Sequence, residues 1–268
     1  MVAPRRYARD GETVDDPASG SRTVEVPFHR YSVGNLTGYD LMGGVQFTLL
    51  FALGLREYHT LCDVGCGSLR AGRLLIPYLE PGKYFGIEPR QAVLDDGIRT
   101  ELGPSLVELR RPRFDTGEDF GLSRFQTDFD FVLAQSVFSH TFRDLAVVGL
   151  DHIATALAPG GLFVGTVYEE FPILLPRGTN RRPDEGTGFL HQGAVVYTWR
   201  DWTALMRDAG LVARRVRWYH NRQTWFVAAH TDHEAAAKKL IGDAINRLRG
   251  PGFLGHARRR ALARLGGR

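Results

Sequence analysis

A glycine-rich turn between an apolar segment and a helical pattern constrains this chain more than any other feature. A short apolar run ends at Asp63, and Gly65 and Gly67 follow, within the segment TLCDVGCGSLRAG at residues 60–72. Leucines at helical spacing come next, so the order predicts a strand, a turn and a helix. Open α/β sheets hold nucleotide-like ligands at such a point. The glycines allow a sharp turn and close approach to a ligand, and the first N–H groups of the helix point toward that ligand.

The spacing of the glycines excludes two common phosphate-binding turns. A dinucleotide-binding turn has the pattern G-x-G-x-x-G, and its third glycine would fall where this chain has Arg70. No Lys-Ser or Lys-Thr pair follows the turn, which excludes a P-loop. The remaining pattern, D-x-G-x-G before a helix, resembles the first motif of the class I S-adenosylmethionine (SAM) methyltransferases.

Three later segments match the same family in order and at typical spacing. Residues 83–88 read as a second strand ending in Glu88, 21 residues after Gly67. A carboxylate there can accept hydrogen bonds from both hydroxyls of a ribose. Residues 128–135 read as a buried strand, and residues 157–166 read as a helix end, a Pro-Gly-Gly turn and another strand. From these motifs the chain is identified as a member of the family.

The resemblance implies an α/β fold with a doubly wound, mostly parallel sheet of seven strands, the last of them antiparallel. We expect an N-terminal helical extension with a cap helix over 1–57, a SAM-binding domain over 58–230 and a basic helical tail over 231–268. A Pro-, Gly- and Arg-rich insert at 171–198 is expected to cover the substrate, because long loops in compact domains are usually functional. Hydrophobic spacing predicts helices at 40–57, 69–79, 90–101, 143–157, 199–209, 232–248 and 253–265, and closing strands at 211–219 and 223–230.

The resemblance also implies SAM as the cofactor and S-adenosylhomocysteine as its product. The residues expected at the cofactor are Asp63, Gly65, Cys66, Gly67, Arg70, Glu88, Pro89, Asp119 and Gln135. Arg70 fits equally well as a partner of the methionine carboxylate and as an arginine on a helix surface. Asp115 is an alternative to Asp119 after the third strand. Gln46 and Gly44 fit helix packing better than contact with the cofactor.

Methyl transfer from a sulfonium is an in-line displacement with a neutral leaving group. It depends on alignment and exclusion of water, so no metal site is predicted. An oxygen or nitrogen acceptor must also lose a proton. The candidate proton acceptors are His140, Glu169 and His191, and the candidate substrate contacts are Tyr168, Arg177 and Tyr197. Each candidate also has a plain structural interpretation, such as capping for the first histidine or a solvated strand edge for the glutamate.

The net charge of +4 is concentrated at the C-terminus. Residues 238–268 hold nine Lys or Arg and one acid, whereas the rest of the chain carries 25 basic and 29 acidic residues. Within this tail, the basic helix expected from His256 to Arg264 either contacts an anionic surface, such as a membrane or nucleic acid, or forms a solvated basic end. No basic patch interleaved with aromatic residues is visible, so nucleic acid is not an expected partner. Arginines in the insert would favour an anionic small-molecule acceptor.

Targeting signals do not change this interpretation. The start of the chain lacks the apolar core of a secretory signal, and its longest apolar stretch, Phe47 to Leu55, is too short to cross a bilayer. The two cysteines, Cys62 and Cys66, match no disulfide or familiar metal pattern. We therefore expect a reducing cytoplasm.

The function expected from the sequence is SAM-dependent methylation of a small molecule at oxygen or nitrogen. One alternative is a SAM-binding protein of the same fold that does not methylate, because cofactor binding and catalysis lie on different loops. Another is methylation of a macromolecule guided by the basic tail. The sequence leaves the acceptor and the oligomeric state open.

Overall fold

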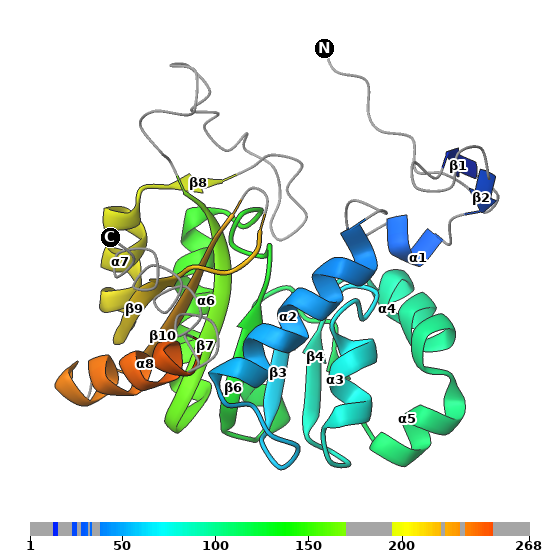
Figure 1. Ribbon diagram of the computed structural model, residues 1–268, viewed down its shortest axis with the longest axis horizontal. Coiled ribbons are helices and arrows are strands. Elements are labelled where there is room, and N and C mark those ends of the chain that lie inside the picture. Colours follow the sequence, from blue (N-terminus) through cyan, green and yellow to red (C-terminus); the bar gives the residue numbers. More distant parts are fainter. Residues whose placement is uncertain are drawn as a thin grey trace, which may run out of the picture.

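The computed structural model describes residues 13–15, 23–25, 28–31, 33, 38–169, 195–220, 223–230 and 234–248. Its central feature is a sheet of the order β5-β4-β3-β6-β7-β10-β9 (Figure 1). The strands are β3 (Leu61–Val64), β4 (Tyr84–Ile87), β5 (Arg113–Asp115), β6 (Phe129–Ala134), β7 (Leu157–Glu169), β9 (Leu211–Val216) and β10 (Thr224–His230).

The strand directions confirm the predicted sheet. Neighbours from β5 to β7 run parallel, whereas β10 is antiparallel to both β7 and β9. A two-residue strand, β8 (Val196–Tyr197), pairs with the carboxyl end of β7. Two short strands near the N-terminus, β1 (Thr13–Asp15) and β2 (Thr23–Glu25), form a separate antiparallel pair.

Helices cover the sheet in two layers. They are α1 (Phe28–Tyr31), α2 (Tyr39–Leu53), α3 (Gly72–Tyr78), α4 (Gln91–Gly97), α5 (Pro104–Arg110), α6 (Arg143–Ala156), α7 (Trp199–Asp208) and α8 (Glu234–Leu248). A π-helical turn, η2 (Ile98–Leu102), continues α4, and a 3-10 turn, η3 (Leu122–Phe125), precedes β6. No helix among the described residues is long and apolar enough to cross a membrane.

The two layers form two apolar cores, one on each face of the sheet. One core joins α6 and α7 to the sheet through fully buried Ile153 and Trp202. The other joins α2, α3 and α8 through Leu50, Leu75 and Ile241, and these three helices lie on the near face in Figure 1. Both faces of the central strands are therefore buried, as expected for parallel strands in an α/β protein.

Helix α8 is part of the folded core, although it lies in the segment predicted to be a basic tail. Its Ile241 and Ala244 are fully buried. Arg247 on its last turn donates from Nη2 to the carbonyl of Leu53, over 2.7 Å. Only residues 249–268 of the predicted tail lie beyond this helix, and they fall outside the described residues.

Left-handed residues move two helix boundaries away from their predicted positions. Helix α2 ends at Leu53 because Gly54 adopts a φ of 115° and its N–H closes the last turn. Helix α3 begins at Gly72, three residues after the predicted start, because Leu69 has a φ of 64° and belongs to the preceding turn. Leu69 is fully buried there, so its apolar character indicated burial and not helix.

The Pro-Gly-Gly turn predicted before the fifth strand is a bulge inside β7. Phe129 of β6 pairs with Leu157, and Phe131 pairs with Leu162, so β7 takes up extra residues over this step. Gly160 accommodates the bulge with a φ of 82°.

Candidate active site

The carboxyl ends of three neighbouring strands bring the predicted cofactor residues together. In the sheet, β3 lies between β4 and β6 and is parallel to both. The glycine turn follows β3, Glu88 follows β4, and Gln135 follows β6. The turn is fixed to its neighbour because the N–H groups of Gly65 and Cys66 both donate to the carbonyl of Ile87, over 2.8 and 3.0 Å.

Both glycines of the turn are required by its geometry. Gly65 and Gly67 have φ values of 68° and 57°, in the left-handed region that favours glycine. A Cβ on Gly65 would lie 2.6 Å from Cγ2 of Val137, and a Cβ on Gly67 would lie 2.6 Å from Cγ1 of Val33. The turn is therefore packed tightly on both sides as well as sharply bent.

Glu88 is a buried carboxylate held against the turn, with only 3% of the residue exposed. Its Oε2 accepts the N–H of Gly67 over 3.0 Å. Its Oε1 accepts both the backbone N–H and the side-chain Nε of Arg90, over 3.1 and 2.9 Å. Each carboxylate oxygen has two lone-pair directions, so Oε2 retains the capacity to accept another donor.

Arg70 is a mostly buried cation whose described hydrogen-bond partners are all neutral, although the carboxyl of Asp63 attracts it electrostatically. Its Nη1 donates to the carbonyl of Val33 over 3.1 Å, and its Nη2 donates to Oε1 of Gln135. Its buried Nε has no hydrogen-bond partner among the described residues, and no ion pair within them includes it. Burial lowers the pKa of the guanidinium. Arg70 precedes α3. The interpretation of Arg70 as an arginine on a helix surface is therefore wrong.

Gln135 is the centre of a polar cluster that no pattern in the sequence predicts. Its Oε1 also accepts Nε2 of Gln46 over 3.2 Å, and its Nε2 lies 3.2 Å from Nε2 of His220. Burial, followed by the charge of Arg70, lowers the pKa of His220 to about 4, so the imidazole is neutral at pH 7. His220 comes from the loop before β10, which starts beside the carboxyl end of β7. The antiparallel closing strand was the signal that could have identified it.

The other predicted cofactor residues differ in their surroundings. Cys66 is buried, and burial raises the pKa of its thiol. Pro89 is half-buried next to Glu88. Asp119 is exposed and forms an ion pair with Arg124. Asp115 lies closer to the turn in the sheet, because its carbonyl accepts the N–H of Glu88 over 3.1 Å.

The predicted acceptor residues fall at the ends of β6 and β7. His140 is half-buried in the loop after β6, and its ring meets the Tyr168 ring edge-on at 6.2 Å. Tyr197 on β8 is buried beside Trp202, and its hydroxyl has no partner among the described residues. Burial raises the pKa of Tyr197 to about 12. His191 and Arg177 lie outside the described residues.

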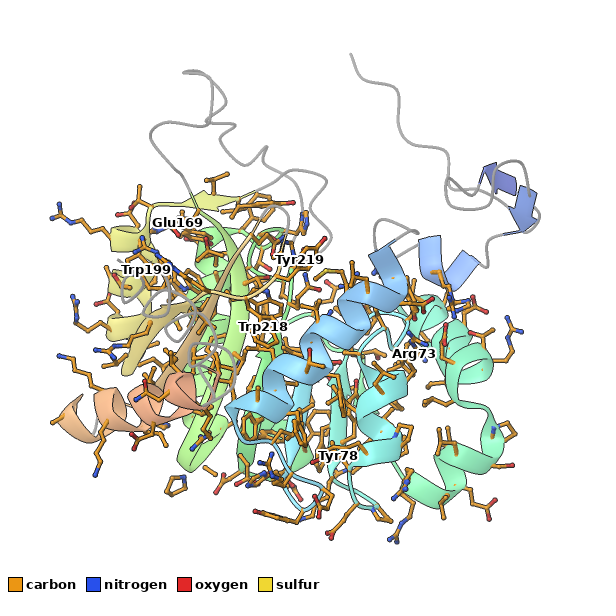
Figure 2. The ribbon with its side chains drawn as sticks, viewed as in Figure 1. Arg73, Tyr78, Glu169, Trp199, Trp218 and Tyr219 are labelled. Atoms are coloured by element: carbon orange, nitrogen blue, oxygen red, sulfur yellow. The ribbon has the colours of Figure 1, made fainter. Side chains whose placement is uncertain are left out.

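Glu169 is engaged by an arginine. It is 8% exposed at the end of β7, and its two oxygens accept Nε and Nη2 of Arg215, the first over 3.0 Å. The same guanidinium stacks over Trp199 at 4.4 Å, and Figure 2 shows Glu169 and Trp199 in the same region. Two-pronged pairing of this kind fixes both groups.

Comparisons with known proteins decide the family. Residues 62–163, from β3 into β7, match the family model of a methyltransferase domain. Over this segment the chain is a methyltransferase domain of the class I SAM-dependent type. The cofactor of this family is SAM. None of the curated proteins matches the methyltransferase by sequence.

Solved structures show the same fold at low identity. Magnesium protoporphyrin IX methyltransferase from Synechocystis PCC 6803, with bound SAM, is 16% identical at a TM-score of 0.53, over 77% of this chain and 86% of that one. A SAM-dependent methyltransferase from Clostridium acetobutylicum is 13% identical at a TM-score of 0.52, over 72% of this chain and 92% of that one. A glycopeptide N-methyltransferase in complex with SAM is 11% identical at a TM-score of 0.53, over 70% of this chain and 94% of that one.

The buried carboxyl of Asp63 in the methyltransferase predicts an unusual pH dependence. Burial raises its pKa from 3.8 to about 7, although the Tyr84 hydroxyl donates to it over 2.8 Å. The folded state then holds this proton more tightly than the unfolded chain, so Asp63 destabilises the fold increasingly as pH rises from about 4 to about 7. The stability advantage of Asp63→Asn over wild type should therefore be about 2–3 kcal/mol larger at pH 8 than at pH 5.

Urea unfolding at the two pH values measures this difference. The matched control is Asp119→Asn, because Arg124 lowers the pKa of that exposed carboxyl. Asp119 is ionised at both pH values, so its variant should differ from wild type by the same amount at pH 5 and pH 8. An equal effect of Asp63→Asn at both values would contradict the assignment.

The pairing of Glu169 predicts that its carboxylate supports the fold. Glu169→Gln loses the charge opposite Arg215, and we expect the free energy of unfolding to fall by about 1–2 kcal/mol. Because no described contact joins Glu169 to the glycine turn, SAM affinity should stay within about twofold of wild type. Thermal unfolding and calorimetric titration measure the two effects. A transfer rate reduced more than about tenfold, with stability unchanged, would instead place this carboxylate in the chemistry.

Proposed function

We propose that this methyltransferase transfers the methyl group of SAM to an oxygen or nitrogen atom of a small-molecule acceptor and releases S-adenosylhomocysteine. The observation that carries the cofactor part is Arg70. A mostly buried cation that donates only to neutral described acceptors is unfavourable, and a carboxylate matches the guanidinium with two parallel hydrogen bonds. The methionine part of SAM supplies such a carboxylate.

The neighbouring residues fit the rest of the cofactor. Glu88 has the acceptor capacity to bind ribose hydroxyls, and the glycine turn leaves no Cβ between backbone and ligand. Asp63 lies in β3, Gln135 follows the neighbouring strand β6, and both would bind the ammonium end. Pro89 and Cys66, the second of which lies within the turn, would line the site of the nucleoside, and Asp119 would contact the adenine amine.

On the acceptor side, the enzyme's own residues have to align the acceptor and take up a proton. When bound, SAM supplies a methyl group activated by its positive sulfur. His140 is the side chain we assign to accept the proton from the acceptor, because histidine titrates near neutral pH and this one follows β6. Tyr168 holds the ring edge-on, and Tyr197 supplies a buried hydroxyl that has no described partner. His191 and Arg177 remain proposals in the insert.

Names of similar proteins support a small acceptor. The Synechocystis enzyme is named for magnesium protoporphyrin IX, and another similar structure is named for a glycopeptide. Both acceptors are small molecules. An anionic acceptor would suit the arginines of the insert.

Transfer of a labelled methyl group tests the proposal. The full chain is incubated with SAM carrying a labelled methyl group and with fractionated small-molecule extracts, and the label is followed by mass spectrometry. Label in a small-molecule fraction, lost in His140→Gln but retained in a variant truncated after residue 248, is the expected result. Tight SAM binding without transfer to any fraction would support a non-methylating SAM-binding protein. Label only in macromolecules, lost on truncation, would support the tail-guided alternative.

A further inference from the structure

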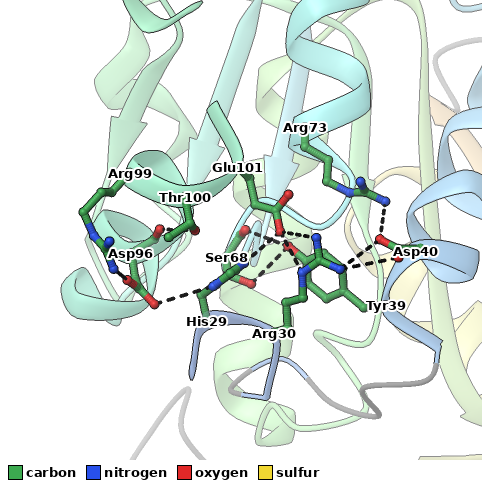
Figure 3. A network of polar contacts seen from close by, with 10 residues as sticks. All are labelled: His29, Arg30, Tyr39, Asp40, Ser68, Arg73, Asp96, Arg99, Thr100 and Glu101. Carbon is green, nitrogen blue, oxygen red and sulfur yellow. Dashed lines mark hydrogen bonds and ion pairs between the residues drawn. The ribbon is translucent and has the colours of Figure 1, made fainter. Parts of the chain in front are cut away.

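Helix α1 is attached to the α4–η2 segment through a buried histidine (Figure 3). His29 is 3% exposed. Its Nε2 lies 2.7 Å from Oε1 of Glu101, and its Nδ1 lies 3.7 Å from Oδ2 of Asp96. Glu101 is nearly buried as well, with 8% of its side chain exposed. A charged or polar group at such depth is stable only when it is paired, so this contact defines where α1 docks.

Arg30 joins the same carboxylate to the start of α2. Its Nε donates to Oε1 of Glu101 over 3.0 Å, and its Nη1 donates to Asp40 over 3.3 Å. The guanidinium lies over the ring of Tyr39 at 4.8 Å. The Tyr39 hydroxyl in turn donates to the carbonyl of Ser68, over 2.9 Å, directly after the glycine turn.

Three residues after Arg30, the chain touches the cofactor edge directly. Val33 places Cγ1 against Gly67, where an added Cβ would lie 2.6 Å away. The carbonyl of Val33 is one of the two described acceptors of Arg70. The position of α1 thus determines whether the Val33 side chain covers the turn and whether the Val33 carbonyl can accept the Arg70 guanidinium.

The attachment of α1 depends on these polar contacts because the helix is short. Four residues are far fewer than an isolated helix needs to be stable in water. Glu101 receives both His29 and Arg30, so removing this one carboxylate leaves two cationic or polar groups of α1 without their shared partner.

We propose that Glu101, His29 and Arg30 form a clamp of positioning residues that retains the cofactor. The clamp holds Val33 over the glycine turn and keeps Arg70 oriented toward the carboxylate of SAM or S-adenosylhomocysteine. It rests on the proposed function, because it acts on the same cofactor site. Its main effect is on dissociation, since interactions formed after encounter change the off-rate more than the on-rate.

Dissociation of S-adenosylhomocysteine from the full-length chain tests the clamp. Stopped-flow displacement and calorimetric titration are carried out on wild type, Glu101→Gln, Arg30→Ala, Arg30→Lys and the control Thr100→Ala. Thr100 adjoins Glu101, but its hydroxyl donates to the carbonyl of Asp96 in α4 and to no other group among the described residues. We expect an off-rate and Kd about tenfold higher for Glu101→Gln and Arg30→Ala, a smaller rise for Arg30→Lys, and no change for Thr100→Ala.

The outcomes separate the clamp from the proposed function. Wild type that fails to bind S-adenosylhomocysteine overturns both the cofactor site and the clamp. Wild type that binds, with off-rates unchanged in folded Arg30→Ala, overturns the clamp alone. If Thr100→Ala raised the off-rate as much as Arg30→Ala, the cause would be a general loosening of η2, and this result would also contradict the clamp. Arg30 is 30% exposed, so Arg30→Ala keeps the test valid if Glu101→Gln does not fold.

Discussion

Replacing Arg70 with methionine is expected to weaken SAM binding about a hundredfold, which corresponds to about 2.7 kcal/mol. The described hydrogen bonds of the guanidinium all go to neutral acceptors, and no described ion pair includes it, so it can still form a two-pronged pair with the methionine carboxylate. Methionine keeps the length of the apolar stem and removes the charge. In the absence of cofactor, the loss of an unpaired buried cation should leave stability unchanged or raise it. Calorimetric titration and thermal unfolding with and without SAM measure both effects.

A second arginine provides the control for Arg70→Met. Arg247 also donates to a neutral carbonyl, that of Leu53 at the C-terminal end of α2. Arg247→Met should lower stability through the lost hydrogen bonds and leave SAM affinity within about twofold. Equal losses of affinity in the two variants would contradict a specific role for Arg70, as would normal SAM binding by Arg70→Met.

Replacing Gly65 with alanine is expected to abolish measurable SAM binding and to destabilise the fold by about 2–4 kcal/mol. The φ of 68° is strained for any residue with a Cβ. The new methyl group would also lie 2.6 Å from Cγ2 of Val137, which is buried in the core behind the turn and has little room to move. Denaturant unfolding and titration with SAM measure the two losses.

Gly82→Ala separates backbone strain from steric overlap. Gly82 has a φ of 76°, close to that of Gly65, but a Cβ there would meet nothing within 4 Å. It should therefore show only the conformational cost, about 1 kcal/mol, with normal SAM affinity. If Gly82→Ala destabilised the protein as much as Gly65→Ala, packing against Val137 would not be the cause.

The parts of the site that the sequence predicted are those with local signals. The order of apolar run, glycines and helix marked the turn at Asp63 to Gly67, and the spacing of the next strand marked Glu88. Parallel pairing then placed both at one edge of the sheet, as the family resemblance implied. The sequence did not predict where α3 begins, because hydrophobic spacing does not reveal the left-handed φ of Leu69.

The parts that the sequence did not predict depend on contacts between distant segments. His220 reaches Gln135 only because the closing hairpin is antiparallel, which brings together residues 85 positions apart. The contact of His29 with Glu101 spans 72 positions. The burial of Ile241 on α8 was hidden by the basic residues around it, since charge suggested a solvated tail. In each case the residue type was visible, and its partner was set by the fold.

A structure of the protein with bound S-adenosylhomocysteine tests the central claim most directly. We expect the carboxylate of its amino-acid part within hydrogen-bond distance of the Arg70 guanidinium, and its ribose hydroxyls against Glu88. Gln135 should then give up part of its contact with Arg70, because the carboxylate is the stronger acceptor. An amino-acid part bound elsewhere, with Arg70 still bonded only to Val33 and Gln135, would contradict the account.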